Sequence, residues 1–96
     1  MAYLEDHAKK VLAEKGYVKI INEHVINDYQ GRAVFLAKSD SGLYAVLAYD
    51  WGTCEYCCRF DSATDEKIEE YLQDDINEIG SDFELADKEF KRACSW

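Results

Sequence analysis

The chain has 96 residues, of which 48% are apolar, and its net charge of −9 is concentrated in residues 60–96, which hold twelve acids against four bases. This length and composition suit one folded domain spanning residues 1–96 and exclude a disordered chain, whose hydrophobicity is low. The excess of acids disfavours direct binding to nucleic acid or to an anionic membrane, since both need Lys and Arg, and it favours a basic protein partner.

The N-terminal half predicts one helix followed by three strands. Residues 2–15 place apolar side chains on one helical face, and Gly16 follows at the position of a C-terminal cap. Three runs rich in β-branched and aromatic residues then predict strands at 17–26, 32–38 and 43–51. The connections are short and have turn-forming compositions, which predicts an antiparallel meander.

The third predicted strand, residues 43–51, is apolar on both of its alternating faces. Such a strand lies in the centre of a sheet and is covered on two sides. We expect a helix on one side and a partner chain on the other, so a homodimer is among the predicted assemblies.

The C-terminal region predicts two helices. Residues 61–79 have an apolar stripe at helical spacing and an N-cap at Ser62 or Thr64. A last short helix begins at Ser81, which has the spacing of a capping box with Glu84. The predicted fold class is therefore α+β, with a small antiparallel sheet of three or four strands, an N-terminal helix and two C-terminal helices, in the order α-β-β-β-α-α.

Three of the four cysteines lie in one stretch, residues 49–60, which reads YDWGTCEYCCRF. Cys54 and Cys57 have the spacing of a zinc or thiol-redox site. A thioredoxin-like site needs a parallel βαβ unit and a cis-proline, and this chain has no proline. A zinc site needs further ligands, for which the candidates are Cys58, Cys94, His7 and His24. The third interpretation, which we favour, is a tight turn at Gly52 with the cysteines packed as small hydrophobes and no cofactor.

The pattern Tyr49-x-x-Gly52-Thr53-Cys54-x-x-Cys57 resembles a strand-end motif, Tyr-x-x-Gly-Ser/Thr-Cys-x-x-Cys, of small uncharacterised bacteriophage proteins. In those proteins an acid often follows the second cysteine, whereas Cys58 stands there in this chain. The resemblance implies a phage or mobile-element origin and no particular chemistry. No export signal or membrane span is recognisable, so we expect a cytoplasmic protein, in the host cell if a phage encodes it.

The predicted helix 61–79 is strongly acidic. From residue 65 to residue 78 it has seven carboxylates and one base. Four of the carboxylates are spaced i, i+4 and would align on one helical face: Glu66, Glu70, Asp74 and Glu78. Like charges at this spacing cost a helix stability, and a solvated face more usually includes pairing lysines. Exposed acidic helices are nevertheless common, and this simpler interpretation stays open.

We expect this acidic surface to occupy the basic groove of a nucleic-acid-handling protein, such as a CRISPR or restriction nuclease, with carboxylates where phosphates would lie. Small acidic phage inhibitors of nucleases offer an analogy, and acidic immunity proteins or antitoxins are an alternative. The predicted partner-binding residues are Asp65, Glu66, Glu69, Glu70, Asp74, Glu78 and Asp82. We expect no enzyme, because the sequence has no phosphate-binding glycine loop, no His-Glu-x-x-His and no nucleophile elbow. A zinc-binding or redox module at Cys54 and Cys57 is the other alternative.

Overall fold

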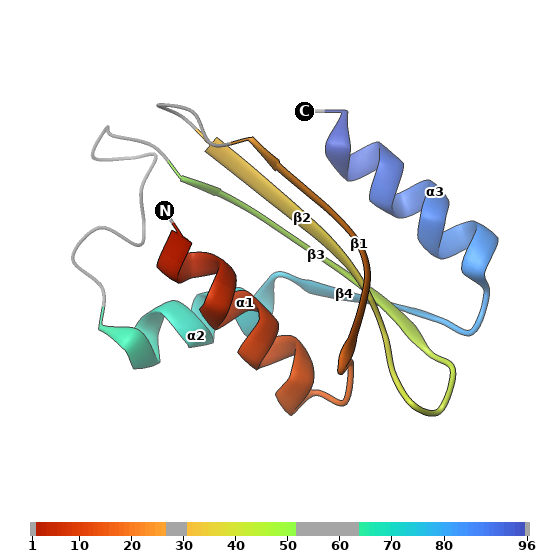
Figure 1. Cartoon of the computed structure of the whole chain (residues 1–96), viewed down its shortest axis with the longest axis horizontal. Coiled ribbons are helices and arrows are strands. Elements are labelled where there is room, and N and C mark those ends of the chain that lie inside the picture. Colours follow the sequence, from red (N-terminus) through yellow and green to blue (C-terminus); the bar gives the residue numbers. More distant parts are fainter. Residues whose placement is uncertain (1, 27–30, 52–63, 96) are drawn as a thin grey trace.

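A four-stranded antiparallel sheet with helices on both faces forms the centre of the molecule (Figure 1). The structure is a computed structural model, and it describes residues 2–26, 31–51 and 64–95. In chain order the elements are α1 (Ala2–Glu14), β1 (Lys19–Ile26), β2 (Gly31–Lys38), β3 (Tyr44–Trp51), α2 (Asp65–Asp74), β4 (Ile76–Gly80) and α3 (Phe83–Cys94). The predicted α+β class is confirmed, and the sheet has the fourth strand.

The end of α1 is set by Gly16, which has a φ of +96°. The N–H of Gly16 donates to the carbonyl of Ala13 (2.9 Å), and the N–H of Tyr17 donates to the carbonyl of Leu12 (2.8 Å). These two bonds make up a Schellman motif, which a glycine in the left-handed region permits. Tyr17 then packs in the same core as Leu12, so the chain turns directly from α1 towards β1. The predicted cap at Gly16 is confirmed.

The sheet is a meander in the order β1-β2-β3-β4, and every neighbouring pair is antiparallel. In the turn between β2 and β3, the hydroxyl of Ser39 accepts from the N–H of Leu43 (3.0 Å), and Gly42 has a φ of +89°. β1 and β4 are the edge strands, and the pairing of β1 with β2 has a register shift between Ile20 and Asn22. The three predicted strands are confirmed, with ends that differ by two residues or fewer.

Helices of the same chain cover both faces of the sheet. The core on the side of α1 and α2 contains Leu4, Ala8, Val11, Leu12, Tyr17, Ala33, Phe35, Ala37, Ala45, Leu47, Tyr49, Ile68 and Leu72. The smaller core on the side of α3 contains Val34, Leu36, Tyr44, Val46, Ala86 and Phe90. β3 is therefore covered twice without a second copy of the chain. The strand that suggested a homodimer no longer supports one, and the homodimer stays a prediction.

The prediction of one continuous helix over residues 61–79 is wrong. α2 ends at Asp74, and Ile76–Gly80 form β4, which pairs with the outer edge of β3. Two physical reasons favour this break. Asp74 and Asp75 stand at the C-terminal end of α2, where the helix dipole disfavours negative charge. In addition, without β4 the backbone groups along that edge of β3 would lack hydrogen-bonding partners, and β4 supplies them.

The two apolar residues of β4 are partly buried, and they lie on opposite faces of the sheet. Ile76, which lies opposite Leu47, packs against the core beside α1 and α2, whereas Ile79 packs against the core beside α3. Successive side chains of a strand alternate between faces, so residues three apart point in opposite directions. On a helix the same two residues would share a face.

Each of the two C-terminal helices is capped by the side chain of the residue directly before it. Thr64, one of the two predicted caps of α2, accepts a hydrogen bond from the N–H of Lys67 (3.3 Å). At α3 the cap is Asp82 rather than Ser81, and its carboxylate accepts from two N–H groups of the first turn, at 3.0 and 3.3 Å. The predicted capping box of Ser81 and Glu84 is wrong, because the N–H of Glu84, which the Ser81 hydroxyl would have to accept from, donates to the Asp82 carboxylate.

Candidate functional site

The predicted partner-binding carboxylates lie on three elements and not on one helix. Five of them belong to α2: Asp65, Glu66, Glu69, Glu70 and Asp74. Glu78 is in β4, and Asp82 caps α3. The predicted row of four acids therefore loses its last member, and three carboxylates keep the i, i+4 spacing on α2.

Glu69 faces α1 and helps to hold the two helices together. Its Oε1 lies 2.7 Å from Nζ of Lys10 and 3.4 Å from Nδ1 of His7. Nε2 of the same histidine lies 3.4 Å from Oδ1 of Asp65. The hydrogen bond from Lys10 is the main cause that lowers the pKa of Glu69, and the same bond raises the pKa of Lys10. With its side chain only 18% exposed, Glu69 acts in the packing of α2 on α1.

Glu78 and Asp82 also interact with their own chain. The carboxylate of Glu78 lies beside Tyr17, whose pKa is raised first by burial and then by this negative charge. The carboxylate of Asp82 accepts hydrogen bonds from the first turn of α3. These two acids contribute to the local structure, and neither continues the row on α2.

Glu66, Glu70 and Asp74 are the exposed carboxylates that form the acidic row of α2. Glu70 lies 3.5 Å from the ammonium of Lys67, and both side chains are more than half exposed, so this pair contributes little to stability. No Lys or Arg of the described residues lies within ion-pair distance of Glu66 or Asp74. Neighbouring members of the row are about 6 Å apart along the helix axis. This spacing is close to two phosphate steps of about 3.4 Å on one DNA strand.

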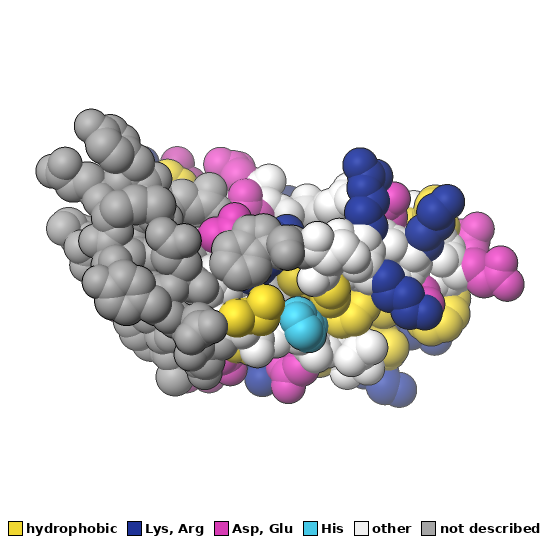
Figure 2. Space-filling model, turned by 90° about the horizontal axis from the view of Figure 1, so that it is seen from above, with side chains coloured by type: hydrophobic (Ala, Val, Ile, Leu, Met, Phe, Trp, Pro, Cys, Tyr) yellow, Lys and Arg dark blue, Asp and Glu magenta, His cyan; other side chains and the backbone are white. Residues whose placement is uncertain are grey.

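α3 carries its charges differently. Its twelve residues include three acids and three bases, whereas the ten residues of α2 include five acids and one base. In α3 the carboxylate of Asp87 lies 2.9 Å from Lys91, and that of Glu89 lies 3.6 Å from Arg92. Figure 2 looks onto the side of the molecule where α3 lies and shows basic and acidic side chains interspersed there. α3 therefore balances its own charge, and α2 does not.

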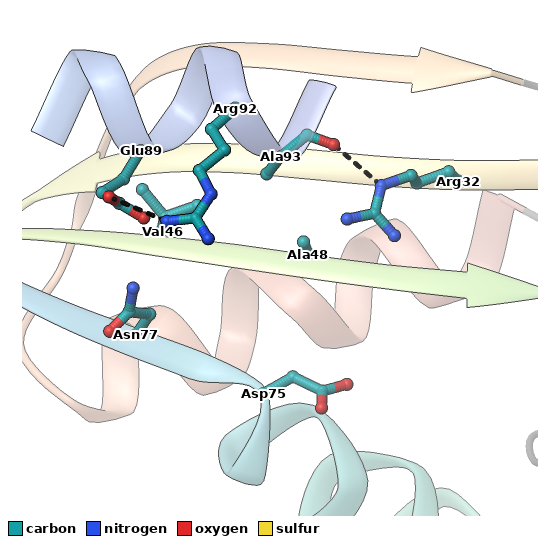
Figure 3. A pocket seen from close by; sticks show the side chains of 8 residues that line it. All are labelled: Arg32, Val46, Ala48, Asp75, Asn77, Glu89, Arg92 and Ala93. Atoms are coloured by element: carbon teal, nitrogen blue, oxygen red, sulfur yellow. Dashed lines mark hydrogen bonds and ion pairs between the residues drawn. The ribbon is translucent and has the colours of Figure 1, made fainter. Parts of the chain in front are cut away.

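A hollow of about 290 Å³ lies beside α3 on the sheet (Figure 3). Its lining comes from β2, β3, α3, β4 and the residue that ends α2: Arg32, Val46, Ala48, Asp75, Asn77, Glu89, Arg92 and Ala93. The sequence interpretation missed this hollow. The available signal was Arg32, a charged residue directly before the apolar run 33–37, which the antiparallel pairing of β2 with β3 places opposite Asp50.

The predicted metal ligands Cys54 and Cys57 lie outside the described residues, as does Cys58. Within the described part of the chain, no group of three or more His, Cys, Asp or Glu side chains is arranged to hold a metal ion. The remaining candidate ligands are on different elements: His7 on α1, His24 on β1 and Cys94 on α3. Cys94 is half-buried, and its burial raises the pKa of its thiol, an effect that Arg32 opposes.

Comparisons with protein-family models, curated proteins and solved structures found no match to this chain. None of the described helices is both long and apolar enough to cross a membrane. The acidic row of α2 and the hollow beside α3 are therefore the features from which a function can be argued.

Proposed function

We propose that this protein binds a basic protein that handles nucleic acid, such as a nuclease, and blocks its nucleic-acid site. The observation that carries this proposal is the acidic row of α2: Glu66, Glu70 and Asp74 are exposed and spaced one helical turn apart. α2 itself contains five acids and one base, and no Lys or Arg of the described residues pairs with Glu66 or Asp74. In this proposal the groove of the partner supplies the cations.

The cost of the row supports a role in binding. Like charges four residues apart destabilise a helix by a few tenths of a kcal/mol per pair, and the row contains two such pairs. Asp74 adds a further cost because it stands at the negative end of the helix dipole. In the basic groove of a partner, the same carboxylates would make favourable contacts with Lys and Arg, which would offset their cost to the helix.

Long-range electrostatics favour the same partner. A net charge of −9 on 96 residues attracts a basic protein before contact and speeds association at low ionic strength. Since exposed charges are screened within about 8–10 Å at physiological salt, the affinity should fall as salt is added.

The proposal uses a smaller set of contact residues than the sequence suggested. Asp65 remains in the set, because its side chain is 84% exposed although it lies near His7. Glu69, Glu78 and Asp82 leave it, since their carboxylates serve contacts within the chain. The same proposal includes three further points. The protein acts by binding and not by catalysis, a phage encodes it, and it acts in the cytoplasm.

The test is competition with DNA for a panel of purified basic nucleases, measured at low and at high salt. The test variant is Glu66→Gln/Glu70→Gln/Asp74→Asn. The matched control is Glu14→Gln/Asp40→Asn/Glu84→Gln, which removes three charges from exposed positions outside α2.

The proposal expects the wild type and the control to displace DNA from at least one nuclease at low salt. The test variant should bind that nuclease about tenfold or more weakly, since each exposed charge pair contributes up to about 1 kcal/mol. Equal binding by the test variant and the control would show that the row is not the contact surface. Displacement that does not depend on salt would count against an electrostatic mechanism.

A further inference from the structure

Exposed apolar side chains gather at one end of the sheet. Among the described residues, the large apolar side chains that remain exposed to solvent are Val18, Ile21, Leu43, Phe83 and Leu85. They belong to three places that meet at the right of Figure 1: the start of β1, the turn before β3 and the first turn of α3. Exposed apolar groups that cluster in this way are typical of a surface that binds another protein. The hollow beside α3 is not such a surface, because its charged groups have partners within the chain.

Cross-strand pairing brings these three places together. Lys19 at the start of β1 lies opposite Lys38, the last residue of β2, and Lys38 lies opposite Tyr44 of β3. Tyr44 in turn lies opposite the last residue of β4, and its ring packs on that of Phe83, with the ring centroids 5.5 Å apart. At about 4.8 Å between strands, this row across the sheet is about 14 Å wide. Asp82 is not available on it, because its carboxylate caps α3. The residues along the row and in the adjoining turns are called the end surface: Val18, Lys19, Ile21, Lys38, Asp40, Leu43, Phe83, Glu84 and Leu85.

The two sides of the end surface carry opposite charges. On the β1 side, Lys19 and Lys38 stand directly opposite each other, which is unfavourable for like charges. No carboxylate of the described residues lies within ion-pair distance of either lysine, and Nζ of Lys38 lies 5.5 Å from the centre of the Tyr44 ring. On the α3 side, the exposed Glu84 has no ion-pair partner among the residues that the structure describes. Asp40, in the turn between β2 and β3, brings the formal charge of the end surface to zero.

We propose that a second copy of this chain binds the end surface, so that two copies form a symmetric dimer. In a twofold contact the same surface serves both copies, and its two sides meet in opposite order. Lys19 of each copy then lies near Glu84 of the other. The apolar residues of the β1 side cover Phe83 and Leu85 of the other copy and remove these side chains from water. Such a contact is closed, so it does not continue to larger assemblies.

The position of the end surface suits a chain of high negative charge. α2, which carries the acidic row, lies towards the opposite end of the sheet (Figure 1). Two copies that meet at their end surfaces therefore keep their acidic rows apart and exposed, although each copy has a net charge of −9. The contact uses no residue of the row, so this proposal does not rest on the proposed function.

The dimer should be weak, because the end surface is small. The two shorter dimensions of the molecule are 27 and 18 Å, so its end offers less than the ~800 Å² per partner of a standard interface. We expect a Kd of about 10–100 μM. The competition for nucleases, run well below this concentration, compares monomers and is independent of dimer formation.

Sedimentation equilibrium at protein concentrations from about 1 μM to about 1 mM measures the self-association. The weight-average mass of the wild type is expected to rise from the 11.1 kDa of one chain towards twice that mass. Val18→Ser/Leu85→Gln removes one apolar side chain from each side of the end surface and should raise the Kd about tenfold or more. The two side chains are 56% and 44% exposed, so the variant should fold as the wild type does.

A charge exchange tests the twofold arrangement. Lys19→Glu and Glu84→Lys each place like charges at both charged contacts of the dimer, so each variant alone should dimerise about tenfold more weakly. In an equimolar mixture, the mixed dimer has opposite charges at both contacts and should form about as tightly as the wild-type dimer. The matched control is a mixture of Lys88→Glu and Glu70→Lys, which has the same net charges but changes exposed residues outside the end surface. Mixing should give the control pair no gain over its separate variants.

Three results would overturn the proposal. A wild type that stays monomeric at about 1 mM would leave the end surface to a different protein. An unchanged Kd in Val18→Ser/Leu85→Gln would place the contact elsewhere on the molecule. If the mixture of Lys19→Glu and Glu84→Lys gains no more than the control mixture, the β1 and α3 sides do not meet. Should Val18→Ser/Leu85→Gln fail to fold, the charge exchange decides the question alone.

Discussion

α2 and α3 cover opposite faces of one sheet, and both bury an apolar stripe, yet their solvent-exposed faces differ. α2 buries Ile68 and Leu72 and has four more acids than bases. α3 buries Ala86 and Phe90, has equal numbers of acids and bases, and forms intrahelical ion pairs. The packing requirements of the two helices are therefore alike, and only the charges of their exposed faces set them apart.

This difference teaches which surface requires an explanation beyond stability. The ion pairs of α3 are spaced i, i+3 and i, i+4, as expected for a solvated helix that favours its own fold. The acidic row of α2 opposes the helix that carries it. A surface that costs stability is the better candidate for a role in binding.

The largest effects should show that both helices are integral to the fold. Leu72→Ala in α2 and Phe90→Ala in α3 each remove a buried side chain, exposed by 0% and 5% respectively, and leave a cavity. We expect each variant to lower the free energy of unfolding by about 2–5 kcal/mol in urea denaturation. A loss below about 1 kcal/mol in either would mean that its helix contributes little to the core.

The N-cap of α3 should give an effect of intermediate size. Asp82→Ala removes the acceptor of two first-turn N–H groups and should lower the free energy of unfolding by about 1 kcal/mol. Ser81→Ala is the control and should change it by less than about 0.5 kcal/mol. A larger loss of stability from Ser81→Ala than from Asp82→Ala would show that Ser81, and not Asp82, caps α3.

Opposite charge changes at the C-terminal ends of α2 and α3 should change the free energy of unfolding in opposite directions. Asp74→Lys places a cation at the C-terminal end of α2 and four residues after Glu70, so thermal or urea unfolding should show a gain of about 0.5–1 kcal/mol. Lys91→Asp in the last turn of α3 should cause a loss of similar size, because it also breaks the pair with Asp87. A loss from Asp74→Lys, or a gain from Lys91→Asp, would contradict the explanation by the helix dipole.

The smallest effect concerns pH. The pKa of Glu69 is lowered in the folded protein from its usual value of 4.5, so below that value the unfolded chain binds more protons. The stability from the Lys10–Glu69 pair is therefore present above about pH 4.5 and is lost as the pH falls through the lowered folded value.

Urea denaturation at a series of acidic pH values checks this expectation against Glu69→Gln. The wild type should lose stability more steeply than the variant as the pH falls below 4.5. Because the pKa of Lys10 is raised above 10.5, the variant should also lack the part of the alkaline loss that this lysine causes. If the free energy of unfolding depends on pH in the same way in both proteins, the Lys10–Glu69 pair does not help to hold α2 on α1.

The first half of the fold was predictable because its sequence patterns have one interpretation. The turn at Gly16 and the β-branched runs of β1 to β3 agree with a helix followed by a meander. Ile76 and Ile79 have two interpretations, since residues three apart share a face on a helix and lie on opposite faces in a strand. Only a sheet with an open edge and a core on each face favours the strand, and that information is tertiary.

The candidate site was predictable to the extent that it is local. The i, i+4 spacing of Glu66, Glu70 and Asp74 can be seen in the sequence. The contacts of Glu69 with Lys10 depend on the packing of α2 on α1, which no local pattern shows. The hollow was hidden for the same reason, because its lining comes from five elements that meet only in the folded sheet.

The register shift in β1 has a consequence for behaviour at high concentration. A regular eight-residue edge strand with exposed Ile21 would be a template for strand pairing between molecules, the first step of aggregation. The shift between Ile20 and Asn22 interrupts the ladder that such growth would have to continue. The other edge, β4, offers only five residues. Both borders of the sheet thus resist lateral growth, which helps the protein to remain dispersed at high concentration.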